Sequence, residues 1–253
     1  MILCKMDLAK KLKAIAQTFF PRSCSLCREA LEAHHQTLCS GCTNDLPYNN
    51  NFCLKCAEPL VSVGLCPACQ KKPPNYRRCL TLCDYSYPIS TAIRCIKKNP
   101  FTPETKQLSL LFAGKLQNAY TTEDLPKIFI PMPIHPLKML TRGFNQSQLI
   151  AYFLSSKIPK TQVLNTICRR RYFGKSHKLS NRQQRLKLSP MTFSIDHPSV
   201  IQGKSLALID DVVTTGSTAT AATTSLLNAG AKSVDLWCIA KTSWHNDSSS
   251  IKI

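Results

Sequence analysis

The fold is decided by Leu206-Ala207-Leu208-Ile209-Asp210-Asp211-Val212-Val213-Thr214-Thr215-Gly216-Ser217-Thr218. Its apolar first half predicts a buried strand, and its hydroxyl- and glycine-rich second half predicts a turn that opens a helix. Backbone N–H groups of that turn, residues 213–218, and the positive end of the helix favour a phosphate, and Gly216 permits close approach. Asp210 and Asp211 would accept hydrogen bonds from the 2′-OH and 3′-OH of a ribose. The stretch therefore predicts a site that holds a phosphate and a sugar diol together.

Apolar runs alternate with helical patterns around this stretch, which is typical of strands and crossover helices on a mainly parallel sheet. Strands are expected at residues 80–85, 127–132, 163–167, 205–209 and 233–240. Helices are expected at residues 89–98, 105–120, 149–154 and 217–228, with a loop over residues 135–146. The predicted fold class is α/β.

Eight of the 14 cysteines form four Cys-x-x-Cys pairs, which are Cys24/Cys27, Cys39/Cys42, Cys53/Cys56 and Cys66/Cys69. Each pair can place two thiolates on one side of a tetrahedral ion, so the pairs predict two four-thiolate Zn²⁺ sites. Such sites leave no open position for water, so they are expected to be structural. Sequential use of the pairs (first with second, third with fourth) is preferred, and interleaved use also fits the spacing.

The chain of 253 residues is long enough for two unequal domains. We expect an N-terminal amphipathic helix over residues 1–22, a double zinc ribbon over 23–72, the α/β domain over 77–243 and a frayed tail over 244–253. The boundary between ribbon and α/β domain rests on the proline-rich linker at Pro73 and Pro74.

Lysine and arginine number 33 against 14 acidic residues, a formal net charge of +19. Such a field attracts phosphates of nucleotides or nucleic acids, although a generally basic surface is a competing interpretation. The sequence has no run of about 18 apolar residues, the length of a membrane-spanning helix. Its N-terminus also lacks an uninterrupted signal-peptide core. We therefore expect a cytoplasmic protein.

The segment Asp210 to Gly216 resembles the signature of type I phosphoribosyltransferases, and nearly the whole chain resembles the ComF competence protein family. The resemblance rests on the cysteine pairs, on Arg142-Gly143-Phe144-Asn145-Gln146 and on the Asp-Asp-Val-Val-Thr-Thr-Gly motif. It implies a type I phosphoribosyltransferase-like, mainly parallel sheet that follows an N-terminal double zinc ribbon in the sequence. It also implies a role in natural transformation, the uptake of DNA.

A pyrophosphate-binding loop containing Arg142, Gly143, Asn145 and Gln146 is implied by the same resemblance. Arg142 can bridge phosphate oxygens, and the two amides can donate at the following helix start. The remaining predicted substrate-binding residues come from the signature loop and its acidic pair: Asp210, Asp211, Val213, Thr214, Thr215, Gly216, Ser217 and Thr218. Lys97 matches a lysine position common in the family and ranks below Arg142.

A basic stretch takes the place of the mobile loop that the family carries after its second strand. Its predicted nucleic-acid-binding residues are Arg169, Arg170, Arg171, Lys175, Lys178, Arg182 and Arg185. The stretch would close over pyrophosphate, or grip single-stranded nucleic acid, or simply be a solvated basic surface. The chain departs from the family pattern at Ser176, His177 and Leu188, where relatives carry glutamine or asparagine.

Two hypotheses for function follow. The first is a DNA-processing accessory protein that binds phosphoribosyl pyrophosphate or a nucleotide, contacts single-stranded DNA, and works with other competence or recombination proteins. The second is an active phosphoribosyltransferase, in which Mg²⁺ and the pyrophosphate loop stabilise pyrophosphate leaving ribose C1. A transferase also needs a pocket for its acceptor base, and the sequence does not identify one.

Overall fold

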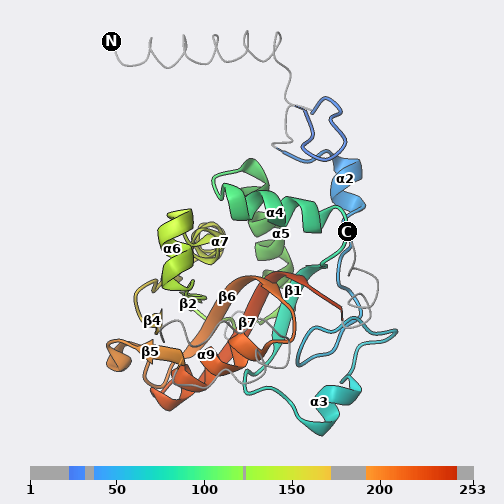
Figure 1. Ribbon diagram of the computed structural model, residues 1–253. Coiled ribbons are helices and arrows are strands. Elements are labelled where there is room, and N and C mark those ends of the chain that lie inside the picture. Colours follow the sequence, from blue (N-terminus) through green and yellow to red (C-terminus); the bar gives the residue numbers. More distant parts are fainter. Residues whose placement is uncertain (1–22, 32–36, 122–123, 172–191, 244–253) are drawn as a thin grey trace, which may run out of the picture. The chain divides into compact units, whose positions relative to one another are not determined.

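The computed structural model describes residues 23–31, 37–121, 124–171 and 192–243 (Figure 1). The chain divides into two compact units, residues 1–46 and 47–253. Within the first unit, the described residues form one ribbon with the short helix α2 (Ser40–Asn44). The expected helix over residues 1–22 and the tail over 244–253 lie outside the described residues.

The second unit contains the rest of the described elements, in the order of an α/β domain. They are α3 (Pro67–Lys71), β1 (Cys79–Asp84), α4 (Ile89–Lys98), α5 (Pro103–Ala119), β2 (Ile128–Pro131), α6 (Pro136–Arg142), α7 (Gln146–Ser155), β3 (Gln162–Val163), β4 (Cys168–Arg170), β5 (Phe193–Ile195), the 3-10 helix η3 (Pro198–Val200), β6 (Ser205–Val213), α9 (Ser217–Asn228) and β7 (Ser233–Lys241).

A five-stranded parallel sheet with the order β1-β7-β6-β2-β3 forms the centre of this unit (Figure 1). The central strand β7 is buried along almost its whole length, and β6 is buried along most of its length. Parallel strands covered on both faces are near-continuous apolar runs, which is the pattern of Ser205–Val213 before its acidic pair. The predicted α/β class, with a mainly parallel sheet that follows a cysteine-rich module in the sequence, is confirmed.

Alternate side chains of the strands pack on opposite faces of the sheet. Leu206 and Leu208 belong to one core cluster, which also holds Ala222 and Leu226 of α9. On the other face Trp237 packs edge-on against Phe129 and against Tyr120, the C-cap residue of α5. The sheet is therefore a middle layer between helices, which leaves the ends of its strands for other contacts.

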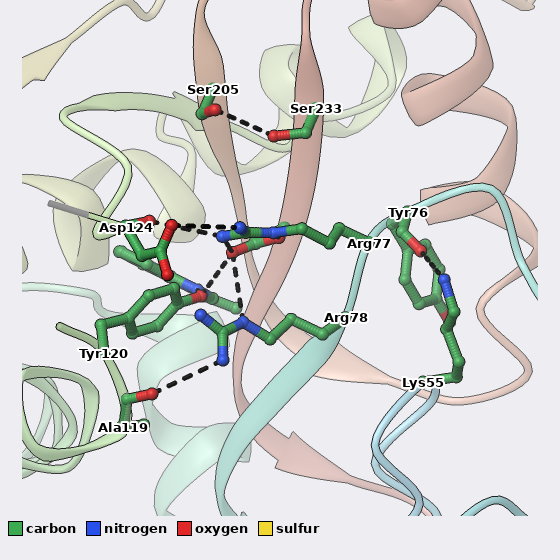
Figure 2. A network of polar contacts seen from close by, with 11 residues as sticks. Lys55, Tyr76, Arg77, Arg78, Ala119, Tyr120, Asp124, Ser205 and Ser233 are labelled. Carbon is green, nitrogen blue, oxygen red and sulfur yellow. Dashed lines mark hydrogen bonds and ion pairs between the residues drawn. The ribbon is translucent and has the colours of Figure 1, made fainter.

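A buried polar network closes the amino end of β1 and β7 (Figure 2). Asp235 is fully buried and accepts two hydrogen bonds of 2.7 Å from Arg77. The hydroxyl of Tyr120 donates to Asp235 at 2.6 Å and accepts from Trp237 at 2.7 Å, and the guanidinium of Arg78 lies 3.7 Å from the Tyr120 ring centroid. Since the polar groups of Asp235, Tyr120 and Trp237 are hydrogen-bonded within this network, we interpret this end of the sheet as structural.

Two details differ from the sequence-based expectation. The expected loop over residues 135–146 contains helix α6, because Pro136 stands at its first position, His135 caps it and Gly143 ends it in the left-handed conformation. The expected strand at residues 163–167 is replaced by β3 and the separate β4, which pairs antiparallel with β5. Strand β3 stops early because its partner β2 ends at Pro131, which has no N–H to donate.

None of the helices in the described part of the chain has the length and apolar character that crossing a bilayer requires.

Candidate functional site

A polar cavity of about 230 Å³ opens at the carboxyl ends of β2 and β6. Its walls come from α6, the start of α7, the loop between β6 and α9, Lys97 of α4 and Arg170 of β4. Ligands of open α/β sheets bind at this edge, where the loops after the strands meet. All predicted substrate-binding residues line the cavity except Gly143 and Thr215.

The loop from Val213 to Ser217 turns the chain sharply from strand to helix. Gly216 has φ +75° and caps α9. The hydroxyl of Thr215 donates to Ser217 Oγ at 3.1 Å and accepts from the Ser217 N–H at 3.4 Å. The first N–H groups of a helix have no partner within the helix, so this loop and the start of α9 offer donors and a positive dipole end to an anion.

Glycine at position 216 is required on two counts. Its positive φ is strained for any residue with a Cβ. A Cβ built there would also lie 3.0 Å from the hydroxyl oxygen of Tyr76, which is buried directly against the loop. Tyr76 is a supporting residue that sequence reasoning missed, because nothing in its local sequence places it beside residue 216.

The two carboxylates at the end of β6 have different partners. Asp211 is buried, and its Oδ2 lies 3.2 Å from Nζ of Lys97 and accepts from Nε2 of Gln146 at 3.3 Å. Asp210 accepts from the Ser147 hydroxyl at 3.0 Å and from the Asp211 N–H at 2.9 Å. Both side chains are thus oriented by neighbours while they line the cavity.

Burial, and next the negative charge of Asp211, raise the pKa of Asp210 to about 8. At neutral pH this carboxyl therefore holds a proton for most of the time until a cation or a ligand draws it into the ionised form. A bound ligand that favours the ionised form would release that proton. The pair is accordingly a site whose charge responds to what binds beside it.

Four cations, Lys97, Lys138, Arg142 and Arg170, line the same cavity. Their positive charge affects His135. Its pKa is lowered mainly by burial and further by the positive charges of Arg170 and Lys138. Together they outnumber the two carboxylates, so the cavity favours an anion that carries more than one negative charge.

The predicted pyrophosphate loop splits into residues with different roles. Arg142 ends α6 at the cavity wall. The Asn145 amide is used within the protein, because its Oδ1 accepts from Ser147 N at 3.0 Å and its Nδ2 donates to Met132 O at 3.0 Å. Gly143 ends α6 with φ +75°. Arg142 is therefore the member of this loop best placed to meet a ligand.

The basic stretch begins on β4. Arg170 reaches the cavity, and its pKa is lowered by burial although Asp210 opposes that effect. Arg169 pairs with Asp196 at 2.7 Å, and Arg171 is exposed. The other predicted nucleic-acid residues lie outside the described part of the chain, and they are Lys175, Lys178, Arg182 and Arg185. Strand β4 pairs antiparallel with β5, so the described residues on the two sides of segment 172–191 lie together.

The eight predicted zinc ligands form two groups of four with all sulfur atoms of a group within 4.8 Å of one another. Cys24, Cys27, Cys39 and Cys42 form one group, and Cys53, Cys56, Cys66 and Cys69 form the other. The preferred sequential pairing is therefore confirmed, and the interleaved pairing is wrong.

Each group has the dimensions of a tetrahedral zinc site. The sulfur atoms of Cys27 and Cys39 lie 3.7 Å apart, as do those of Cys56 and Cys66. Zn–S bonds of about 2.3 Å in a tetrahedron predict sulfur–sulfur edges of about 3.8 Å. Burial by itself raises the pKa of Cys53, but backbone N–H groups of Cys66, Cys56 and Lys55 lower it to about 7. Both groups therefore fit structural Zn²⁺.

Comparison with known proteins agrees with this arrangement. Residues 15–70 match the double zinc ribbon domain. The chain is 33% identical over 225 residues to the DNA utilization protein YhgH of Escherichia coli O157:H7, covering 88% of this chain and 98% of the relative. It is 27% identical over 227 residues to competence protein F of Haemophilus influenzae, again covering 88% of this chain and 98% of the relative.

A hypoxanthine phosphoribosyltransferase from Staphylococcus aureus is among the similar solved structures. It is 14% identical, with a TM-score of 0.34, and the likeness covers 54% of this chain and 62% of that structure. A likeness of this degree says nothing about the ligand of this chain. With 33% identity over nearly the whole length of a DNA utilization protein and a double zinc ribbon in place, the chain belongs to the ComF family of competence and DNA utilization proteins.

Proposed function

We propose that the cavity binds phosphoribosyl pyrophosphate or a nucleotide, and that the chain uses this site while it handles single-stranded DNA. One observation carries the proposal. The acidic pair, the glycine turn before α9 and four cations meet in one cavity at the carboxyl edge of the sheet. This set offers acceptors for a sugar diol beside donors for phosphates.

The ligand would be oriented by the order of these groups along the cavity. The start of α9 and the loop before it would bind the 5′-phosphate, since backbone N–H groups and the helix dipole favour an anion there. Asp210 and Asp211 would hold the ribose hydroxyls, with Mg²⁺ entering together with the pyrophosphate. Arg142, Lys97 and Arg170 would compensate the pyrophosphate charge.

Calorimetric titration with phosphoribosyl pyrophosphate and Mg²⁺ tests the ligand. The wild-type chain is expected to bind in the micromolar range, and the double variant Asp210→Ala, Asp211→Ala is expected to lose binding. Asp45→Ala is the matched control, because Asp45 is an exposed carboxylate of the first unit. Equal binding by wild type and double variant would refute the assignment of the site.

DNA contact is proposed from charge and from family membership. The chain has a formal net charge of +19, and relatives carry the names DNA utilization protein and competence protein. Arg171 is exposed at the start of the basic stretch, next to the cavity-lining Arg170. A strand gripped there would lie beside the nucleotide site, so the two ligands could be sensed together.

Salt dependence of binding to a single-stranded oligonucleotide tests this part. Replacing Lys175, Lys178, Arg182 and Arg185 by glutamine should weaken binding and flatten the slope of log K against log salt by about 0.7 per lost phosphate contact. Lys204 and Lys232 are exposed and flank the amino ends of β6 and β7, so their glutamine variants serve as controls. Equal losses per removed charge in both sets would indicate a general charge effect and contradict a defined DNA surface.

Phosphoribosyl transfer is the second candidate function. It is favoured by the excess of four cations over two carboxylates in the cavity, which suits a leaving pyrophosphate better than a single phosphate. Release of pyrophosphate from phosphoribosyl pyrophosphate in the presence of each nucleobase would establish it. Tight binding without release would leave the binding function alone.

A further inference from the structure

The second zinc ribbon contains a knuckle, residues 53–58, that we call the Cys53 knuckle. The Ala57 N–H donates to the Cys53 carbonyl at 2.9 Å, and the Cys53 N–H donates to the Glu58 carbonyl at 2.8 Å. Ala57 has φ 58°, so the chain folds back sharply just after Cys56. Since Cys53 and Cys56 are predicted zinc ligands, the geometry around the metal also sets the position of Glu58.

Glu58 is connected through Lys241 to the loop from Val213 to Ser217, which we call the phosphate loop. Its Oε2 lies 2.8 Å from Nζ of Lys241, and Lys241 donates to the carbonyl oxygen of Thr214 at 2.9 Å. Both charged side chains are buried, at 6% and 1% exposure. A buried charge that loses its partner is strongly destabilised, so Glu58 and Lys241 hold each other in place, and Lys241 holds the loop.

A second contact from the same knuckle supports the phosphate loop through Tyr76. Lys55 Nζ donates to the Tyr76 carbonyl oxygen at 3.2 Å (Figure 2). Tyr76 is 1% exposed, and its hydroxyl lies against Gly216 at the start of α9. The Cys53 knuckle thus contributes to the support of both Thr214 and Gly216, the two residues between which the phosphate loop turns.

We propose that the Cys53 knuckle positions the phosphate loop, and that Glu58 and Lys241 are the positioning residues. Zinc at the second site and a phosphoribosyl ligand then bind with positive coupling, and each raises the affinity of the other by the same factor. The coupling between zinc and ligand rests on the proposed function, because it requires that the loop binds a phosphoribosyl ligand. The support of the loop by the Cys53 knuckle does not depend on that ligand. The second zinc ribbon accordingly supports the ligand site from outside the cavity wall, in addition to stabilising the fold.

The first ribbon provides a matched control within the same chain. Its knuckle has the same backbone pattern: the Cys24 N–H donates to the Glu29 carbonyl at 2.7 Å, the Arg28 N–H donates to the Cys24 carbonyl at 2.9 Å, and Arg28 has φ 68°. Glu29 therefore occupies the position that Glu58 has in the second ribbon. Glu29 is exposed, whereas Glu58 is buried.

The test compares Glu58→Gln with Glu29→Gln in the full chain. Glu58→Gln should weaken binding of Mg²⁺ and phosphoribosyl pyrophosphate about tenfold, within the usual range of coupling between sites, while both zinc ions remain bound. Glu29→Gln should bind as the wild type does. In the wild type, saturating ligand should raise the zinc affinity of the second site about tenfold in competition with a chelator. Unchanged ligand binding in Glu58→Gln, or an equal loss in Glu29→Gln, would overturn the proposal.

Two further measurements separate the possible failures. If Glu58→Gln does not fold, the paired variant Glu58→Gln, Lys241→Gln removes both buried charges and should still show the tenfold loss. Hydrogen exchange of residues 214–218 without ligand should be about tenfold faster in the variant. If the wild type does not bind phosphoribosyl pyrophosphate, the proposed function fails. Hydrogen exchange of residues 214–218 then tests by itself whether the Cys53 knuckle supports the phosphate loop. Equal exchange in variant and wild type would refute it.

Discussion

The ammonium group of Lys97 on α4 lies 3.2 Å from Oδ2 of Asp211 on β6. The two residues are separated by more than a hundred positions in the chain, and they meet because α4 and β6 both reach the cavity. The side chain of Lys97 is 34% exposed and that of Asp211 is 8% exposed. The ion pair therefore joins a buried carboxylate to an ammonium group that solvent can reach. Lys97 thus belongs to the site more firmly than its position on a helix suggested.

Replacing Lys97 by methionine is expected to weaken phosphoribosyl pyrophosphate binding about tenfold, because it removes one of four cations and leaves Asp211 without its ion pair. Calorimetry measures the loss. Lys98→Met is the control, since Lys98 is the exposed neighbour on the same helix and is not part of the cavity wall. Similar losses in both variants would argue against a specific role for Lys97.

Stability without ligand should fall as the pH rises from about 4 to 8. Over this range Asp210 keeps its proton in the folded protein, where its pKa is raised to about 8, and loses it in the unfolded chain. The folded state then binds more protons, so raising the pH favours unfolding. Asp210→Asn should remove about 2 kcal/mol of this dependence, since solvent reaching the partly exposed carboxyl reduces the full effect. Denaturant titrations at pH 5 and pH 8 measure it, and parallel curves for variant and wild type would contradict it.

Ligand binding should release a proton from the same carboxyl. If Mg²⁺ and phosphoribosyl pyrophosphate favour ionised Asp210, their affinity rises with pH between about 6 and 8. The binding enthalpy then changes with the ionisation enthalpy of the buffer. Calorimetry in two buffers at pH 7 measures the number of protons released, and Asp210→Asn should release fewer. A proton count that the variant leaves unchanged would assign the release to another group.

Gly216→Ala should destabilise the protein by about 1–2 kcal/mol, since it adds a Cβ at φ +75° and places it 3.0 Å from the Tyr76 hydroxyl. Adding Tyr76→Phe removes the contact but not the backbone strain, so the double variant should recover part of the loss. Gly114→Ala is the contrasting control, because its Cβ would meet nothing within 4 Å in the middle of α5. That change should stabilise the protein by about 0.5–1 kcal/mol. Thermal unfolding of all three variants makes the comparison.

Substitutions in the two zinc sites should have different effects on ligand binding. Cys27→Ser is expected to lose one zinc ion per chain and to retain ligand binding, because its site lies in the unit formed by residues 1–46. Cys56→Ser is expected to lose the other ion and to weaken ligand binding as well, because its site lies in the unit that contains the cavity. Metal analysis and calorimetry on the same samples measure both effects. Identical behaviour of the two variants would contradict a distinct role for the second site.

The sequence by itself determined the elements of this protein that are encoded in short stretches. The apolar run before Asp210, the glycine turn at Gly216 and the helix after it are local patterns, and the observed β6 and α9 follow them. The spacing of four Cys-x-x-Cys pairs likewise led to two four-thiolate groups, because each knuckle is a local turn. Helix α6 was missed although its start and stop signals, Pro136 and Gly143, were also local.

Only the tertiary structure decided how distant residues meet. The order β1-β7-β6-β2-β3 brings Lys97, Arg142 and Arg170 to one edge of the sheet, and no sequence period encodes that meeting. The contact between Glu58 of the zinc ribbon and Lys241 at the end of the last strand is of the same kind. A buried charge takes its partner from whichever segment packs against it, so pairing across the chain follows from packing and not from spacing in the sequence. The local sequence therefore determined the parts of the site, and the packing of the sheet and the second ribbon determined their assembly.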